Sequence, residues 1–201
     1  DMLSNISKLD RFIACSRVSK RPIFEFISSD IRPNDAMMVF AYEDDYSFGI
    51  LQSNLHIFWY QEKCSTMKGD PRYTTESIWD TYPWPQNPSQ KQVEQVANAA
   101  KALRDERNRI MRENQMTLSD IYRIVDKPGH NTIKILHDEL DAAVIEAYGF
   151  SKRKDVLEQL LQLNLIVATK EAGKEFTQKP GIPPTLAHKK YVTDDSLKFI
   201  I

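Results

Sequence analysis

The stretch FAYEDDYSFGILQSNLHIFWYQ, residues 40–61, decides the fold because it joins three neighbouring acids to a block of aromatic residues. Glu43, Asp44 and Asp45 could form a metal-binding catalytic centre, or only a turn between two buried elements. Consecutive residues of a strand point to opposite faces, so three acids in a row rarely converge on one ion. A nuclease-type centre also needs a lysine beside the acids, and Tyr46 follows instead. The pattern therefore favours a solvated acidic turn over a metal site.

The first 85 or so residues are predicted to be mixed α/β. Short runs rich in β-branched and aromatic residues indicate four strands. These strands are expected at residues 11–18, 22–28, 35–43 and 47–52. Within the last of them, Gly49 marks a bulge or a close packing contact. Ser53 then caps a predicted helix over residues 54–63.

The hydrophobic period changes after Pro83, Trp84 and Pro85, because two prolines around a tryptophan interrupt regular structure and predict a pinned boundary. Beyond it, apolar residues recur at spacings of three and four, which is typical of amphipathic helices. Helices are expected within residues 89–114, 116–125, 131–149 and 151–173. Thr117 and Asp120 form a weakened capping box, and Gly149 is a C-cap.

These patterns predict an α+β protein in which a small mixed α/β module precedes an all-helical module. The expected boundaries are 1–85 for the first module, 86–174 for the second and 175–201 for a loosely structured tail with three prolines. The chain begins at Asp1 with no preamble, and we expect it to be part of a longer protein.

Composition narrows the function further. The formal net charge is −1, so no bulk positive charge indicates nucleic acid. Cys15 and Cys64 lack metal-type spacing and are expected to be reduced thiols of a cytoplasmic protein. No apolar run has transmembrane length, and the glycines are too scattered for a phosphate-binding loop. His56 and His137 could be general bases, but their neighbourhoods predict packed side chains. The chain itself is therefore expected to bind no cofactor and no metal.

Positive charge gathers instead at two turns. Ser16, Arg17, Ser19, Lys20 and Arg21 crowd the first predicted hairpin turn. Arginine on a rigid turn can bind a guanine edge, and hydroxyl groups and lysine can hold phosphates. The alternative is that these residues only keep the turn solvated.

A second group, Lys68, Arg72 and Tyr73, lies in the later irregular loop and completes the predicted DNA-binding set. A third basic run, from Lys101 to Arg112, could track phosphates. It could equally be a solvated helix face with pairs such as Arg109 and Glu113, which is the interpretation we favour.

An ordered series of segments suggests a family. RFIACSRVSKRPIFEFIS, EDDYSFGILQSNLHIFW, DPRYTTESIWDTYPWP, LHDELDAAVIEAYGF and LLQLNL closely resemble the C-terminal part of type IIL (MmeI-like) restriction–modification DNA methyltransferases. The resemblance covers roughly residues 10–170 and rests on order and spacing. It implies that residues 1–85 are the C-terminal part of a DNA target recognition domain, and that 86–174 are a helical C-terminal domain.

The resemblance also implies an N6-adenine-specific parent enzyme that uses S-adenosylmethionine, in some members with an endonuclease domain. The chain lacks the cofactor-binding glycine loop and the Asn/Asp-Pro-Pro-Tyr/Phe motif, so it is expected to be non-catalytic. Its expected partners are double-stranded DNA and the catalytic methyltransferase domain of the same parent, with no membrane. The alternative function is a helical protein–protein interaction module that docks a partner subunit.

Overall fold

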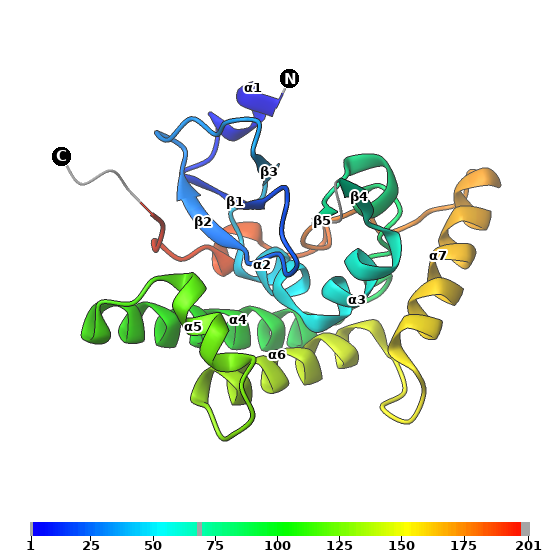
Figure 1. The fold of residues 1–201 in the computed structure, drawn as a ribbon. Coiled ribbons are helices and arrows are strands. Elements are labelled where there is room, and N and C mark those ends of the chain that lie inside the picture. Colours follow the sequence, from blue (N-terminus) through cyan, green and yellow to red (C-terminus); the bar gives the residue numbers. More distant parts are fainter. Residues whose placement is uncertain (1, 68–69, 198–201) are drawn as a thin grey trace.

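The computed structural model describes residues 2–67 and 70–197 (Figure 1). A three-stranded antiparallel sheet lies at its N-terminal end, in the order β2-β1-β3. The strands are β1 (Arg11–Ser16), β2 (Glu25–Ser28) and β3 (Met37–Phe40). The first three predicted strands are therefore confirmed.

The two faces of this sheet pack against different elements. The short helix α1 (Met2–Ile6) contributes Ile6 to a small apolar cluster with Phe12, Ala14 and Ile27. Residues of the opposite face, among them Ile13, belong to the main core. Because side chains alternate along a strand, β1 can serve both clusters at once.

The fourth predicted strand is wrong, because the structure forms the helix α2 (Asp45–Gln52) there. Every residue of α2 is buried, so its sequence shows no amphipathic period. The helix begins where the Asp44 side chain accepts a hydrogen bond from the Ser47 backbone N–H at 2.7 Å. The predicted close packing at Gly49 is confirmed, since it lies against Val96.

The predicted helix after Ser53 is confirmed as α3 (Asn54–Lys63). A two-stranded ribbon follows, formed by β4 (Ser65–Met67) and β5 (Asp70–Arg72), and then a π-helical turn, η1 (Thr75–Trp79). The segment after this turn is buried against the core. Trp84 has 2% exposure and packs near Tyr42 and Tyr46, so it pins the chain as predicted.

The four helices predicted for the second half of the chain are confirmed. They are α4 (Gln90–Asn114), α5 (Leu118–Val125), α6 (Thr132–Tyr148) and α7 (Val156–Ala172). Thr117 and Asp120 form the predicted capping box, and Gly149 adopts a left-handed conformation at φ 68° as a C-cap. Helix α4 runs beneath α2 and beside α6 (Figure 1), and the buried side chains of both halves form one contiguous apolar cluster.

In the described part of the segment after Gly173, which ends at Leu197, one short 3₁₀ helix forms, η2 (His188–Tyr191), and side chains anchor the segment to the body. Asp195 joins Arg11 and Arg104, and Leu197 pairs with β2. Asp195 and Leu197 therefore tie the end of the described segment to the body, and the expected boundaries at 85 and 174 stay a prediction. Among the residues described, no helix is long and apolar enough to cross a membrane.

Candidate nucleic-acid interface

The structure brings the two predicted DNA-binding clusters together. Val18, in the first turn, lies opposite Arg72 in an antiparallel bridge. The Tyr73 N–H donates to the Arg17 carbonyl at 2.8 Å, and the Ser19 N–H donates to the Pro71 carbonyl at 3.2 Å. Turns that are about 50 residues apart in sequence therefore present one continuous surface.

Lys20 and Arg72 are the cations of this surface that remain available. Lys20 is exposed and Arg72 is half-buried. Within residues 2–67 and 70–197, neither side chain has a hydrogen bond or an ion pair. The hydroxyl groups beside them bind their own turn, because Ser16 donates to the Val18 carbonyl and Ser19 donates to the Arg21 carbonyl. Lys20 and Arg72 could therefore bind an anion without breaking an existing contact.

The two arginines of the first turn, in contrast, already have partners. Arg17 Nη2 donates to the Met37 carbonyl at 3.3 Å. Arg21 forms an ion pair with Asp126 at 2.8 Å and lies over the Tyr122 ring. Arg21 therefore fastens the first turn to α5, a role that the sequence did not indicate.

Tyr73 has a structural role that differs from the predicted one. It is 1% exposed and stacks against Tyr60, and its hydroxyl lies 2.9 Å from His56 Nε2. Burial lowers the pKa of His56 to about 4, although the Leu51 carbonyl partly offsets this effect. The burial of Tyr73 therefore argues against the predicted contact between its ring and DNA. Lys68, also in the predicted set, lies outside the described residues.

The acidic triplet is not the solvated turn that the sequence favoured. Asp44 is fully buried and caps α2, where its Oδ2 also accepts from the Ser47 hydroxyl at 2.9 Å. Asp45 is buried between Arg11 at 3.1 Å and Arg104 at 2.6 Å. Burial raises the pKa of Asp45 even though the two arginines oppose the shift. Asp44 and Asp45 thus hold α2 in place through a cap and two buried ion pairs.

The basic face of α4 also differs from the expectation. Arg104 and Arg107 are fully buried, whereas Arg109 is exposed and pairs with Glu113 as predicted. Arg107 pairs with Glu25 and donates to the Phe24 carbonyl at 3.0 Å. Two of the cations that were considered for phosphate tracking therefore join α4 to the sheet region.

His137 is packed, as expected for this histidine. Its Nε2 lies 2.8 Å from the Tyr122 hydroxyl, and burial together with Arg21 and Arg107 lowers its pKa to about 3. Within the described ranges, no three His, Cys, Asp or Glu side chains gather as a metal site. The surface at Lys20 and Arg72 is thus suited to binding an anionic ligand and shows no catalytic constellation among the residues described.

Comparison with known proteins places this surface in a family context. Residues 15–86 match the target recognition domain of MmeI, a range that includes both basic turns. DNA methyltransferase A of Bacillus subtilis (strain 168) is 30% identical over 122 residues, which is 59% of this chain and 13% of that protein.

A solved structure of the type IIL restriction–modification enzyme MmeI in complex with DNA is similar with a TM-score of 0.70. The identity is 20%, over 79% of this chain and 21% of the other. The chain thus spans only about a fifth or less of the length of these relatives. Residues 15–86 are therefore similar to the MmeI target recognition domain.

Proposed function

We propose that this chain supplies DNA sequence recognition to an S-adenosylmethionine-dependent, adenine-specific (N6) DNA methyltransferase of a restriction–modification system. The observation that carries the proposal is the recognition-domain match over residues 15–86. The structure adds a rigid scaffold that presents Lys20 and Arg72 at two adjoining turns. Rigid turns that carry free cations suit groove reading, because phosphate contacts set the position and base contacts supply specificity.

On this proposal the methyl-transfer chemistry belongs to a catalytic domain that binds S-adenosylmethionine, and the present chain reads the sequence and packs against that domain. The relatives leave room for such a domain, since the chain spans 13% of one and 21% of the other. The residues described here would hold no part of the cofactor, and cytoplasmic location follows from the same proposal.

The test has two steps. First, the 201-residue chain is incubated with a pool of randomised DNA duplexes, and the bound molecules are sequenced after several rounds of selection. One enriched motif is expected, with an affinity that falls steeply as salt rises, because bound cations release counterions from DNA. Enrichment of no motif by a folded chain would contradict the proposal.

Second, the full gene of the proposed parent enzyme, with its catalytic domain, is expressed in a host that lacks DNA methylases. N6-methyladenine is then mapped across the host genome by long-read sequencing. Methylation at the selected motif would support the adenine-specific enzyme. Methylation of cytosine instead would retain the recognition function and overturn the adenine assignment.

The helical half supports a second candidate function, which is docking of a partner subunit. Helix α7 exposes Leu165 at 69% and Ile166 at 53%, and Phe176 beyond it is 77% exposed. Apolar side chains exposed together on one element often mark an interaction surface. Replacing Leu165 and Ile166 by Glu should abolish partner binding and leave the salt-dependent DNA affinity unchanged if both functions coexist.

A further inference from the structure

The two edges of the three-stranded sheet are treated differently. At the β2 edge, the Leu197 N–H donates to the Phe26 carbonyl at 2.8 Å, and the Ser28 N–H donates to the Leu197 carbonyl at 3.0 Å. Leu197 therefore pairs with part of that edge. The other edge is β3, which among the described residues pairs with β1 and with no second strand. Proteins usually cover or disrupt an exposed edge, because its free backbone groups accept further strands.

The ladder fixes which backbone groups of β3 face outward. The Arg17 N–H donates to the Ala36 carbonyl at 2.8 Å, and the same register places Cys15 opposite Met38. Hydrogen-bonded and non-hydrogen-bonded pairs alternate along an antiparallel ladder. Cys15 and Met38 therefore form a hydrogen-bonded pair, and the N–H and C=O of Met38 point toward β1. The N–H and C=O of Val39, the next residue, point away from β1. No described residue donates to or accepts from the outward N–H and C=O of Val39.

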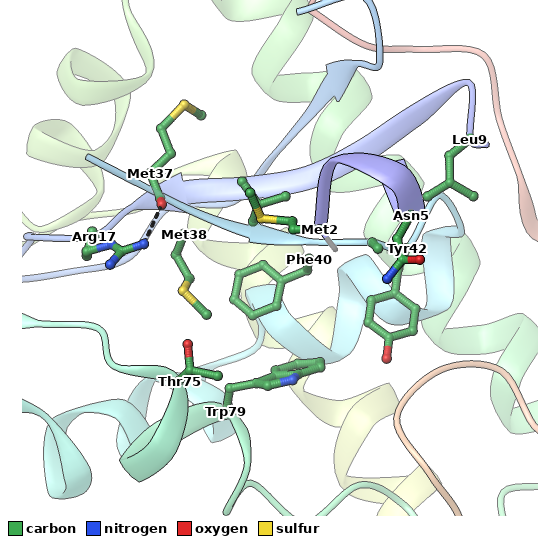
Figure 2. Close-up of a pocket in the computed structure, with 12 residues that line it drawn as sticks. Met2, Asn5, Leu9, Arg17, Met37, Met38, Phe40, Tyr42, Thr75 and Trp79 are labelled. Carbon is green, nitrogen blue, oxygen red and sulfur yellow. Dashed lines mark hydrogen bonds between the residues drawn. The ribbon is translucent and has the colours of Figure 1, made fainter. Parts of the chain in front are cut away.

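An open groove runs along this edge (Figure 2). It has a volume of about 550 Å³, with Met2 and Asn5 of α1 at one wall and Thr75 and Trp79 of η1 at the other. The side chains of Met38, Phe40 and Tyr42 add apolar surface between these walls. The groove therefore offers unpaired backbone groups and apolar contacts in the same place.

A positive charge marks one end of the groove. Arg17 lines it and donates to the Met37 carbonyl, an outward-facing group of β3 (Figure 2). Arg17 Nε is buried and, among the described residues, has no hydrogen-bond partner. None of the residues that line the groove is acidic. Arg17 therefore offers a positive charge at this end of the groove, which a carboxylate of a ligand would complement.

We propose that the β3 edge binds an extended polypeptide segment, which adds a fourth strand beside Val39 and places a carboxylate side chain against Arg17. This mode of recognition uses backbone hydrogen bonds for affinity and alternate side-chain pockets for specificity. The apolar groove at Phe40 and Trp79 would take a hydrophobic side chain of the same segment. The inference rests on the sheet geometry and holds whether or not the chain binds DNA.

The test uses the 201-residue chain and a phage-displayed library of linear seven-residue peptides. Val39→Pro is the decisive variant, because proline is tolerated on an edge strand where the lost N–H faces outward, and it removes a donor that an added strand needs. Val39→Thr is the matched control, since it keeps the N–H and the β-branched shape. Ala41→Pro, whose N–H is also expected to face outward, replaces Val39→Pro if circular dichroism shows that the latter unfolds.

Selected peptides are expected to carry an acidic residue and to protect the Val39 amide from hydrogen exchange. Val39→Pro should weaken their binding at least about tenfold, which corresponds to the loss of one backbone hydrogen bond. Arg17→Gln should remove the preference for the acid, and Val39→Thr should bind like the wild type.

Three results would overturn the proposal. They are peptides whose affinity is insensitive to proline at both positions, a Val39 amide that is already protected in the free chain, and recovery of no peptide. A concentration-dependent dimer that protects the Val39 amide would show that a second copy of the chain occupies the edge. Protection by duplex DNA would show that DNA occupies it. Either result would overturn the peptide proposal.

Discussion

Asp195 Oδ2 accepts a hydrogen bond from Arg104 Nε at 2.8 Å, across 91 residues of sequence. Its Oδ1 also lies 3.0 Å from Arg11 Nη1. Burial alone would raise the pKa of Asp195, but the hydrogen bond and charge of Arg104 lower it well below the usual range. Asp195 thus shares two buried arginines with Asp45 and ties the C-terminal segment to α4 and the sheet.

We expect Asp195→Ala to destabilise the fold by roughly 3 kcal/mol, because two buried cations would then share the single carboxylate of Asp45. Urea unfolding followed by circular dichroism measures the loss. Asp194→Ala is the control, since its side chain is exposed and should change stability by less than about 0.5 kcal/mol. Equal effects of the two variants would show that the ion cluster is not the anchor.

Gly49 tests the contact between α2 and α4. An added Cβ would lie 2.6 Å from Val96 Cγ1 and 3.2 Å from Ala100 Cβ. Gly49→Ala should therefore cost about 1–3 kcal/mol despite the better helix propensity of alanine. The matched control is Gly173→Ala, whose Cβ would find its nearest neighbour at 3.5 Å and should be neutral or slightly stabilising. A stable Gly49→Ala protein would mean that the two helices are further apart.

The α2 segment also shows why one predicted strand was wrong. A fully buried element has no polar face, so periodicity cannot separate helix from strand over eight residues. The Asp44 cap was the available signal, because an acid three residues before Ser47 can bind its backbone N–H. The amphipathic helices α4 to α6 were predictable, since each combines a polar face with capping residues.

The buried arginines of α4 had a signal in the sequence too. From Ala100, steps of four and three along the apolar stripe lead to Arg104 and Arg107, so the helical period already placed both on the buried face. Their partner Asp195 could not be found this way, because no local pattern links residues 91 positions apart. The meeting of the two basic turns was equally invisible, since it depends on the bridge between Val18 and Arg72.

For DNA binding, Lys20→Ala and Arg72→Ala should each weaken affinity for the selected motif. If the lost contact was to a phosphate, the slope of log affinity against log salt concentration should become shallower by about one. If it was to a base, the variant should lose about 1–3 kcal/mol of binding free energy and tolerate other bases at one position of the motif. Fluorescence anisotropy at several salt concentrations separates the two cases. Lys152→Ala is the control, because this surface lysine lies on another part of the chain and pairs with Glu146.

Tyr73→Phe distinguishes the structural role of this residue from a DNA contact. The variant loses the hydrogen bond to His56 Nε2, which should cost about 1 kcal/mol of stability. Its DNA affinity should equal that of the wild type below the unfolding transition, because the ring is buried. A selective loss of affinity without a change in stability would place Tyr73 at the interface after all.

Acid should destabilise the fold through His56. The unfolded chain protonates this histidine near 6.5, whereas burial lowers its folded-state pKa to about 4. The stabilising effect of the neutral ring is thus present above pH 6.5 and is lost as pH falls from 6.5 to 4. At about 1.4 kcal/mol per pKa unit, this shift contributes on the order of 3 kcal/mol. Urea midpoints between pH 7 and pH 4 should therefore fall, and His137 adds to the same slope.

His56→Gln should flatten that slope while lowering stability at pH 7, because the glutamine does not titrate. His188→Gln is the informative control, since the hydrogen bond and charge of Asp44, together with the charge of Glu43, raise the pKa of His188 above 6.5. The contribution of His188 is thus fully present below pH 6.5 and disappears only as pH rises through its folded-state pKa. Removing His188 should leave the slope between pH 6 and pH 4 intact, and a slope that depended on His188 and not on His56 would reverse the assignment.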